Sequence, residues 1–235
     1  MRITFPEREQ DTAELSIDGT RTVYLLPPAT GTHSECFADS NYLKGVRRAT
    51  GKEIAAYAYG ALVYRKNKWE NQDMIRFPSI NYLRIPKVLT IVPKDKKFGD
   101  LEGALIVDED LNGEGIAMKT EVPADLNGWK ASEGEIFERD GRIVVPYEKW
   151  YEEQWNGNNG AAIAIFDGQD SVASLDKTAK DSKRNYKPLW KVDPTKIKDP
   201  ERRVPIVYGY IDGRLGLVCN GSGIDWIGCA ARVLE

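Results

Sequence analysis

The feature that most constrains the fold of this chain is a recurring Asp-Gly or Asn-Gly pair between segments in which apolar residues alternate. The pairs are Asp18-Gly19, Asn112-Gly113, Asp140-Gly141, Asp167-Gly168 and Asp212-Gly213. A type I′ turn needs positive φ at both central residues, which Asn or Asp followed by Gly adopts at little cost. The neighbouring segments that we expect to be strands are 13–17 and 21–26, 105–107 and 116–118, 135–138 and 142–145, 162–166, and 207–211 and 215–219. The pattern predicts a protein rich in β-hairpins.

One region follows a helical rather than an alternating pattern. Thr50 and Glu53 have the spacing of a capping box, in which each side chain binds the free backbone N–H of the other residue. Apolar residues then recur at helical intervals. We therefore expect a helical pair near residues 40–65, with helices over 40–49 and 50–65.

Together these patterns predict the α+β fold class. We expect a mainly antiparallel, hairpin-rich β-sheet, either a sandwich or a strongly twisted sheet, with the helical pair packed on it. Prolines interrupt residues 75–92, which we expect to form edge strands or an extended loop, because proline cannot donate to a sheet ladder. A chain of 235 residues can bury most of its apolar surface in one core, so we expect a single β-rich domain over residues 1–235.

Charge and cysteine content exclude several classes of protein. The chain has 33 Lys and Arg against 36 Asp and Glu, a net charge of −3, which does not suit a uniformly basic nucleic-acid-binding surface. Three cysteines, Cys36, Cys219 and Cys229, argue against a disulfide framework. The sequence has neither the apolar core of a signal peptide nor the roughly 20 apolar residues of a membrane helix. We therefore expect a soluble, cytoplasmic protein without a membrane partner.

The net charge is distributed unevenly along the chain. Residues 174–203 hold ten Lys or Arg and five Asp or Glu, a net charge of +5, which leaves −8 on the rest. Because prolines interrupt this stretch and its apolar periodicity is weak, we expect a long basic loop or excursion. Its cations and aromatics could contact a nucleic acid or an acidic partner by charge and stacking, and the alternative is a solvated loop. The residues concerned are Lys183, Arg184, Tyr186, Lys187 and Trp190.

The one histidine of the chain lies in a segment expected to join a strand to a helix. His33 could act as a general base and Cys36 as a thiolate nucleophile, with Glu35 or Asp39 assisting. The alternative is a surface histidine near a buried cysteine. His33 and the three cysteines also have the ligand types of a zinc site, although they lack its usual paired spacing.

A second cluster combines aromatic and acidic residues. A short helix is expected over residues 147–155, where Tyr147, Tyr151 and Trp155 would lie one above another at intervals of four. Aromatics beside carboxylates, Trp150 and Trp155 among them, suit recognition of a glycan or a peptide. The alternative is an amphipathic helix that packs its aromatics on a sheet.

A third candidate is a cation site. The run from Asp108 through Asp110 to Asn112-Gly113 matches the opening of a calcium-binding loop, in which alternating oxygens surround the ion. An EF-hand is excluded because Lys119 occupies the position where that loop needs a bidentate Glu. A β-hairpin cation site formed by Asp108, Asp110 and Asn112 remains, and the alternative is an acidic hairpin turn.

Two functional hypotheses follow from these observations. The first is a non-catalytic recognition module that binds a protein, glycan or nucleic-acid partner through loops and exposed aromatics. The second is a small hydrolase or transferase with a His33/Cys36 site. The geometry of the loop around His33 discriminates between them, because catalysis needs the imidazole and the thiol to converge in an accessible pocket.

Overall fold

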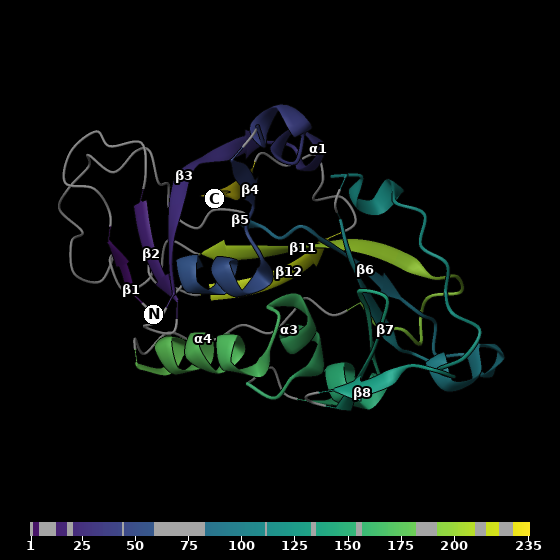
Figure 1. The fold of residues 1–235 in the computed structure, drawn as a ribbon. Coiled ribbons are helices and arrows are strands. Elements are labelled where there is room, and N and C mark those ends of the chain that lie inside the picture. Colours follow the sequence, from purple (N-terminus) through teal and green to yellow (C-terminus); the bar gives the residue numbers. More distant parts are fainter. Residues whose placement is uncertain are drawn as a thin grey trace.

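The described part of the chain is dominated by one continuous series of paired strands (Figure 1). The computed structural model describes residues 2–4, 13–17, 21–43, 45–58, 83–110, 112–132, 135–153, 157–181, 192–209, 215–220 and 228–235. Within them the strands are β1 (Arg2–Thr4), β2 (Ala13–Ile17), β3 (Arg21–Gly31), β4 (Val46–Arg48), β5 (Leu83–Arg84), β6 (Lys87–Ile91), β7 (Leu105–Glu109), β8 (Lys130–Ser132), β9 (Ile136–Arg139), β10 (Arg142–Val145), β11 (Glu201–Gly209), β12 (Leu215–Asn220) and β13 (Gly228–Leu234).

The strand order is β1-β2-β3-β13-β5-β11-β6-β7-β10-β9-β8, with β12 beside β11 and β4 beside β13. Among these pairings, β13 with β5 is parallel and the rest are antiparallel. The α+β class and the mainly antiparallel sheet are therefore confirmed.

Three of the predicted hairpins are present as paired strands. They are β2–β3, β9–β10 and β11–β12. In the β9–β10 turn, Asp140 has φ 51° and Gly141 has φ 77°, the positive values that a type I′ turn requires. Local turn chemistry alone was sufficient to predict this hairpin.

The strand expected after Asn112-Gly113 is not formed. Residues 115–117 make a short 3-10 helix, η3 (Gly115–Ala117). The side chain of Asp110 accepts hydrogen bonds from the backbone amides of Glu114 and Gly115, at 2.9 Å each. These bonds hold the segment in a tight turn, so its backbone does not return along β7 as a second strand.

The predicted strand at 162–166 is also wrong, because α3 (Gly160–Ile165) is helical and all six of its residues are buried. Asn159 caps this helix by accepting from the amides of Ala161 and Ala162. A short apolar run that is buried on every side has no periodicity to separate helix from strand. The Asn159 cap favours the helix because it accepts hydrogen bonds from backbone amides at the helix N-terminus.

The capping box at Thr50 is confirmed. The backbone amide of Thr50 donates to Glu53, and the amide of Glu53 donates to the Thr50 hydroxyl at 3.2 Å. A helix follows over residues 51–58, and residues 59–65 lie outside the described residues. The helix begins at Gly51, where only glycine fits because a Cβ would lie 2.3 Å from the carbonyl oxygen of Ile165.

The first helix of the expected pair, over 40–49, is replaced by a 3-10 turn, η1 (Asp39–Asn41), and by β4. The backbone of β4 pairs with β13, with Arg48 opposite Arg232. This long-range pairing satisfies the polar backbone of the segment as an α-helix would, and it cannot be seen in local sequence.

The basic stretch 174–203 has regular structure at both ends. The helix α4 (Gln169–Asp181) covers its beginning and β11 starts at Glu201, so the predicted loop is not formed at these two ends. Between them, residues 192–200 contain neither helix nor strand, and residues 182–191 lie outside the described residues. The expected edge strands near 75–92 need a similar correction, because β6 lies between β11 and β7 with all five residues buried.

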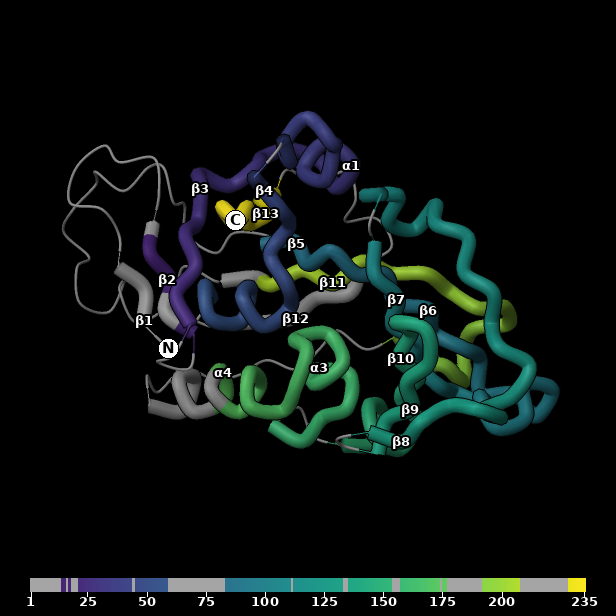
Figure 2. The backbone as a smooth tube through the Cα atoms, in the orientation of Figure 1, coloured from purple at the N-terminus to yellow at the C-terminus, as the bar shows by residue number. Residues whose placement is uncertain are grey.

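The main core lies between one face of the sheet and three helices. Buried apolar residues of helix 51–58, α3 and α4 share a cluster with those of β6, β7 and β13. A smaller cluster on the opposite face of β7 and β10 includes Ile106 and Val144, with Trp129 and Phe137 packed against it. Figure 2 shows that α3 lies beside the end of the sheet formed by β8, β9 and β10. No helix in the described ranges combines the length and apolar character needed to cross a membrane.

Candidate functional site

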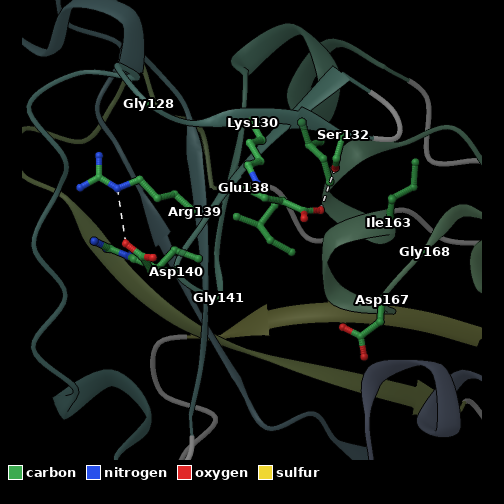
Figure 3. Close-up of a pocket in the computed structure, with 13 residues that line it drawn as sticks. Gly128, Lys130, Ser132, Glu138, Arg139, Asp140, Gly141, Ile163, Asp167 and Gly168 are labelled. Carbon is green, nitrogen blue, oxygen red and sulfur yellow. Dashed lines mark hydrogen bonds and ion pairs between the residues drawn. The ribbon is translucent and has the colours of Figure 1, made fainter.

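A pocket of about 690 Å³ lies between the β8–β10 end of the sheet and the turn that follows α3 (Figure 3). The β8 and β9 part of its sheet wall comes from alternate residues, because successive side chains of a strand point to opposite faces, and residues 139–143 around the β9–β10 turn complete the wall. Gly128, Lys130 and Ser132 line it from β8 and the residues before it, and Ile136 and Glu138 line it from β9. This part of the wall is therefore one face of the β8–β9 ladder.

The register of the ladder places these side chains in rows. Lys130 lies opposite Glu138, and Ser132 lies opposite Ile136. The Ser132 hydroxyl donates a hydrogen bond to Glu138 at 2.7 Å, as Figure 3 shows. Glu138 is thus held against the sheet.

The opposite wall is formed by Ile163 and by the turn at Asp167-Gly168. Asp167 has φ 55°, a left-handed conformation that Asp adopts more readily than most residues. Its carboxylate accepts from the ammonium of Lys87 at 2.5 Å, and Lys87 also contacts Glu109 at 3.0 Å and the carbonyl of Ala164 at 3.2 Å. Asp167 is therefore fixed in place at the pocket wall.

Lys87 is almost completely buried, with 3% of its surface exposed. Burial alone would lower the pKa of its ammonium group, but the carboxylates of Asp167 and Glu109 outweigh this effect and raise the pKa. Lys87 is consequently a cation that positions Asp167, and it lacks the lowered pKa of a nucleophilic lysine.

The remaining charges lie at the rim. Arg139 pairs with Asp140 at 3.5 Å, and Arg142 donates to Asp108 at 2.7 Å. Among the charged residues that line the pocket in the described part of the chain, Lys130 is the one without a hydrogen bond or ion pair. With three basic and three acidic lining residues, the pocket has mixed charge.

His33 is hydrogen-bonded to Asp110, which the sequence analysis placed in the candidate cation site rather than with His33. His33 lies at the start of α1 (His33–Cys36), and its Nε2 donates to the Asp110 carboxylate at 2.5 Å. Each residue is 1% exposed. Burial would raise the pKa of Asp110, but hydrogen bonds from His33, Gly115 and Glu114 outweigh it and lower the pKa. This pair connects α1 to the segment after β7.

The sulfur of Cys36 is directed at backbone carbonyls. It lies 3.5 Å from the oxygen of Gly31, 3.6 Å from that of Ala29 and 3.7 Å from that of Gly228. Burial raises the pKa of the Cys36 thiol, and the nearby Arg84 only partly opposes it. A fully buried thiol with a raised pKa is a poor nucleophile.

The two acids expected to assist catalysis have other contacts. Glu35 accepts from the backbone amide and hydroxyl of Thr32, which lowers the pKa of the Glu35 carboxyl and caps α1. Asp39 is exposed at the start of η1. Neither they nor His33 and Cys36 are among the described residues that line the pocket.

The three residues expected to hold a cation do not share a site, because the two carboxylates have different side-chain partners. Asp108 binds Arg142, Asp110 binds His33, and Asn112 lies in the turn after β7. Within the described ranges, no group of three His, Cys, Asp or Glu side chains is arranged to hold a metal ion. The hydrogen bonds of Asp108 with Arg142 and of Asp110 with His33 stabilise the fold.

Trp150 is a core residue, which corrects its expected role in binding a partner. It lies in a short π-helix, η5 (Glu148–Glu152), is 2% exposed, and its Nε1 donates to the carbonyl of Gly103 at 3.0 Å. Tyr147 and Tyr151 stack at 4.9 Å, as their spacing predicted. Trp155 and the basic-stretch residues lie outside the described residues; these are Lys183, Arg184, Tyr186, Lys187 and Trp190.

Sequence reasoning did not identify the residues that line the pocket. Two of the turns it singled out, Asp140-Gly141 and Asp167-Gly168, form parts of the wall. The available signal was the alternation of polar side chains at Lys130, Ser132 and Glu138, which indicates a polar face on neighbouring strands.

Comparisons with known proteins identify no family for this chain. No protein-family model matches it, and no curated protein matches its sequence. One solved structure resembles its chain path, from work on the accommodation of massive sequence variation in Nanoarchaeota by the C-type lectin fold. The two chains are 14% identical, the match covers 87% of this chain and 94% of the other, and the TM-score is 0.46. A likeness at this level does not indicate a function for this chain.

Proposed function

We propose that the protein is a non-catalytic recognition module whose ligand-binding site is the mixed-charge pocket between β8–β10 and the Asp167-Gly168 turn. The observation that carries the proposal is the fixed polar wall. Asp167 is held by buried Lys87, Glu138 is held by Ser132, and Lys130 makes no hydrogen bond or ion pair with any other described residue. Concave sites with a few oriented polar groups are typical of ligand recognition.

The chemistry of the wall favours a protein partner over a glycan or a nucleic acid. The carboxylates of Glu138, Asp140 and Asp167 would repel the phosphates of a nucleic acid, whose binding depends on neutralisation by cations. The described residues that line the pocket include no aromatic side chain, so there is no stacking platform for a sugar or a base. A polypeptide offers amides, cations and anions together, and it matches the mixed charges of the wall.

The hydrolase or transferase hypothesis has less support. It needs an accessible nucleophile, whereas the Cys36 thiol is buried with a raised pKa and His33 is paired with Asp110. These residues lie at α1, and the described lining of the pocket comes from β8, β9, β10 and α3.

The test compares two tryptophan variants at adjacent positions of β8. Ser132→Trp places an indole in the pocket, whereas Ala131→Trp places it on the other face of the same strand. Labelled wild-type and variant proteins are applied to an array of synthetic peptides of mixed charge, glycans and single-stranded oligonucleotides, and thermal melts check that both variants fold.

We expect the wild type to bind peptides, Ser132→Trp to weaken binding by about tenfold or more, and Ala131→Trp to bind like the wild type. Equal binding by Ser132→Trp and the wild type would place the site elsewhere. Failure of the wild type to bind any of the three classes would refute the recognition function.

A further inference from the structure

The strand that lines the pocket, β8, is also the terminal strand of the sheet in the described part of the chain. It pairs with β9 on one side, and its Lys130 and Ala131 are exposed. A terminal strand leaves alternate backbone N–H and C=O groups without a partner along its outer edge. Such an edge can form a ladder with another extended chain.

The free edge and the pocket share residues. Lys130 and Ser132 belong to β8 and line the pocket, so a chain paired with β8 would place every second side chain on the pocket side. This is the combination used in strand addition, where main-chain hydrogen bonds give affinity and pockets for alternate side chains give specificity.

The charges of the pocket wall indicate which kind of side chain of an added strand would lie opposite β8. Lys130 lies opposite Glu138 on the β9 side, yet Glu138 is hydrogen-bonded to Ser132 and makes no ion pair in the described part of the chain. Among the described residues the ammonium of Lys130 therefore has no ion pair, and a group beyond the edge can supply one. An acidic side chain directly across from Lys130 would form a cross-strand pair of opposite charge.

We infer that the ligand is an extended polypeptide segment that adds to the outer edge of β8 as a further strand, with an acidic side chain opposite Lys130. The inference rests on the proposed function and names the partner and its mode of binding. A second copy of this chain is a weaker fit. Antiparallel pairing of two β8 strands about Ala131 would place each Lys130 opposite a Ser132, without a compensating negative charge.

The probe is a capped, fluorescein-labelled heptapeptide, Thr-Val-Thr-Glu-Thr-Val-Thr, with matched peptides that carry Gln or Lys at the centre. Fluorescence anisotropy measures their binding to wild type, Lys130→Glu and the control Lys96→Glu, which changes an exposed lysine in η2 (Lys96–Leu101). We expect the wild type to prefer the Glu peptide over the Lys peptide by about fivefold or more. Lys130→Glu should reverse this preference, and Lys96→Glu should keep it.

Backbone methylation tests the ladder itself. Two versions of the Glu peptide carry N-methyl groups on alternate amides, one version on even and one on odd residues. Because only one edge of an added strand faces β8, one version should bind at least about tenfold more weakly and the other within about twofold of the parent. Equal effects of the two methylation patterns would overturn strand addition.

Other outcomes separate the inference from the proposed function. If the array selects a ligand that Ser132→Trp excludes but the heptapeptides do not bind, the pocket is a recognition site and the strand inference fails. If sedimentation shows a concentration-dependent dimer that Lys130→Glu alters and Lys96→Glu does not, the occupant of the edge is a second copy, and the inference also fails.

Discussion

Replacing Asp110 with alanine should destabilise the protein strongly, because this buried carboxylate satisfies three donors at once. They are the Nε2 of His33 and the amides of Glu114 and Gly115. A buried donor left without its acceptor costs about 1–3 kcal/mol, so the loss of these bonds together should cost about 3–5 kcal/mol. A typical domain has only about 5–15 kcal/mol of stability in total, so the loss should be large but measurable.

Equilibrium unfolding in urea measures this loss. With an m-value of about 2–3 kcal/mol/M, we expect the midpoint for Asp110→Ala to fall by about 1–2 M relative to the wild type. Asp110→Asn keeps one acceptor oxygen and should lose about half as much. A loss below about 1 kcal/mol for Asp110→Ala would refute the conclusion that His33 and Asp110 form a structural connection.

The same pair makes stability depend on pH in a defined direction. The pKa of Asp110 in the folded protein lies below its ordinary value of 3.8, so the unfolded state binds this proton more readily. Its contribution is fully present above about pH 5 and is lost as the pH falls through 3.8 towards the folded-state pKa. The stability difference between wild type and Asp110→Asn should therefore shrink between pH 5 and pH 3, and a constant difference would contradict the assignment.

Two further predictions concern buried polar groups. Asn159→Ala removes the cap of α3 and leaves the carbonyl of Trp150 without its donor, so urea unfolding should show a loss of about 2–3 kcal/mol in the free energy of unfolding. The control, Asn158→Ala at an exposed position, should change this free energy by less than about 0.5 kcal/mol. Equal losses in the two variants would contradict the role of Asn159 as the cap. Cys36 should resist alkylation by iodoacetamide in the native protein at pH 8 and react in urea, because it is buried and burial raises the pKa of its thiol. Mass spectrometry of the alkylated peptides measures the extent of alkylation. Rapid labelling of the native protein would support Cys36 as a nucleophile.

Features encoded in a few neighbouring residues could be predicted from the sequence. The turn at Asp140-Gly141 needs only the conformational freedom of those two residues, and the capping box needs only Thr50 and Glu53. The hairpins around such turns then fix the antiparallel character of the sheet. Local rules were therefore sufficient for the fold class.

The errors occurred where distant parts of the chain decide the structure. The segment 46–48 becomes a strand because it pairs with β13, and α3 is fully buried because it packs against β7 and β10 as well as its neighbours η5 and α4. His33 and Asp110 are 77 positions apart, so two separate candidate sites proved to be one contact. Local pattern has no information on such pairings.

The pocket could not be predicted for the same reason. Its sheet wall ends near residue 143, and its other wall begins at Ile163. The two meet only when α3 packs against β10, where a Cβ on Gly160 would lie 2.6 Å from the side chain of Val145. Only this packing brings the carboxylate of Asp167 across from the polar face of β8 and β9.

Hydrogen–deuterium exchange with and without the ligand selected by the array tests the central claim most directly. If the pocket is the binding site, ligand should slow amide exchange in two segments, β8 to β10 and the turn at Asp167-Gly168, and leave α1 unchanged. Protection confined to residues 174–203 or to the α1 region around His33, with no change at β8, would contradict the account.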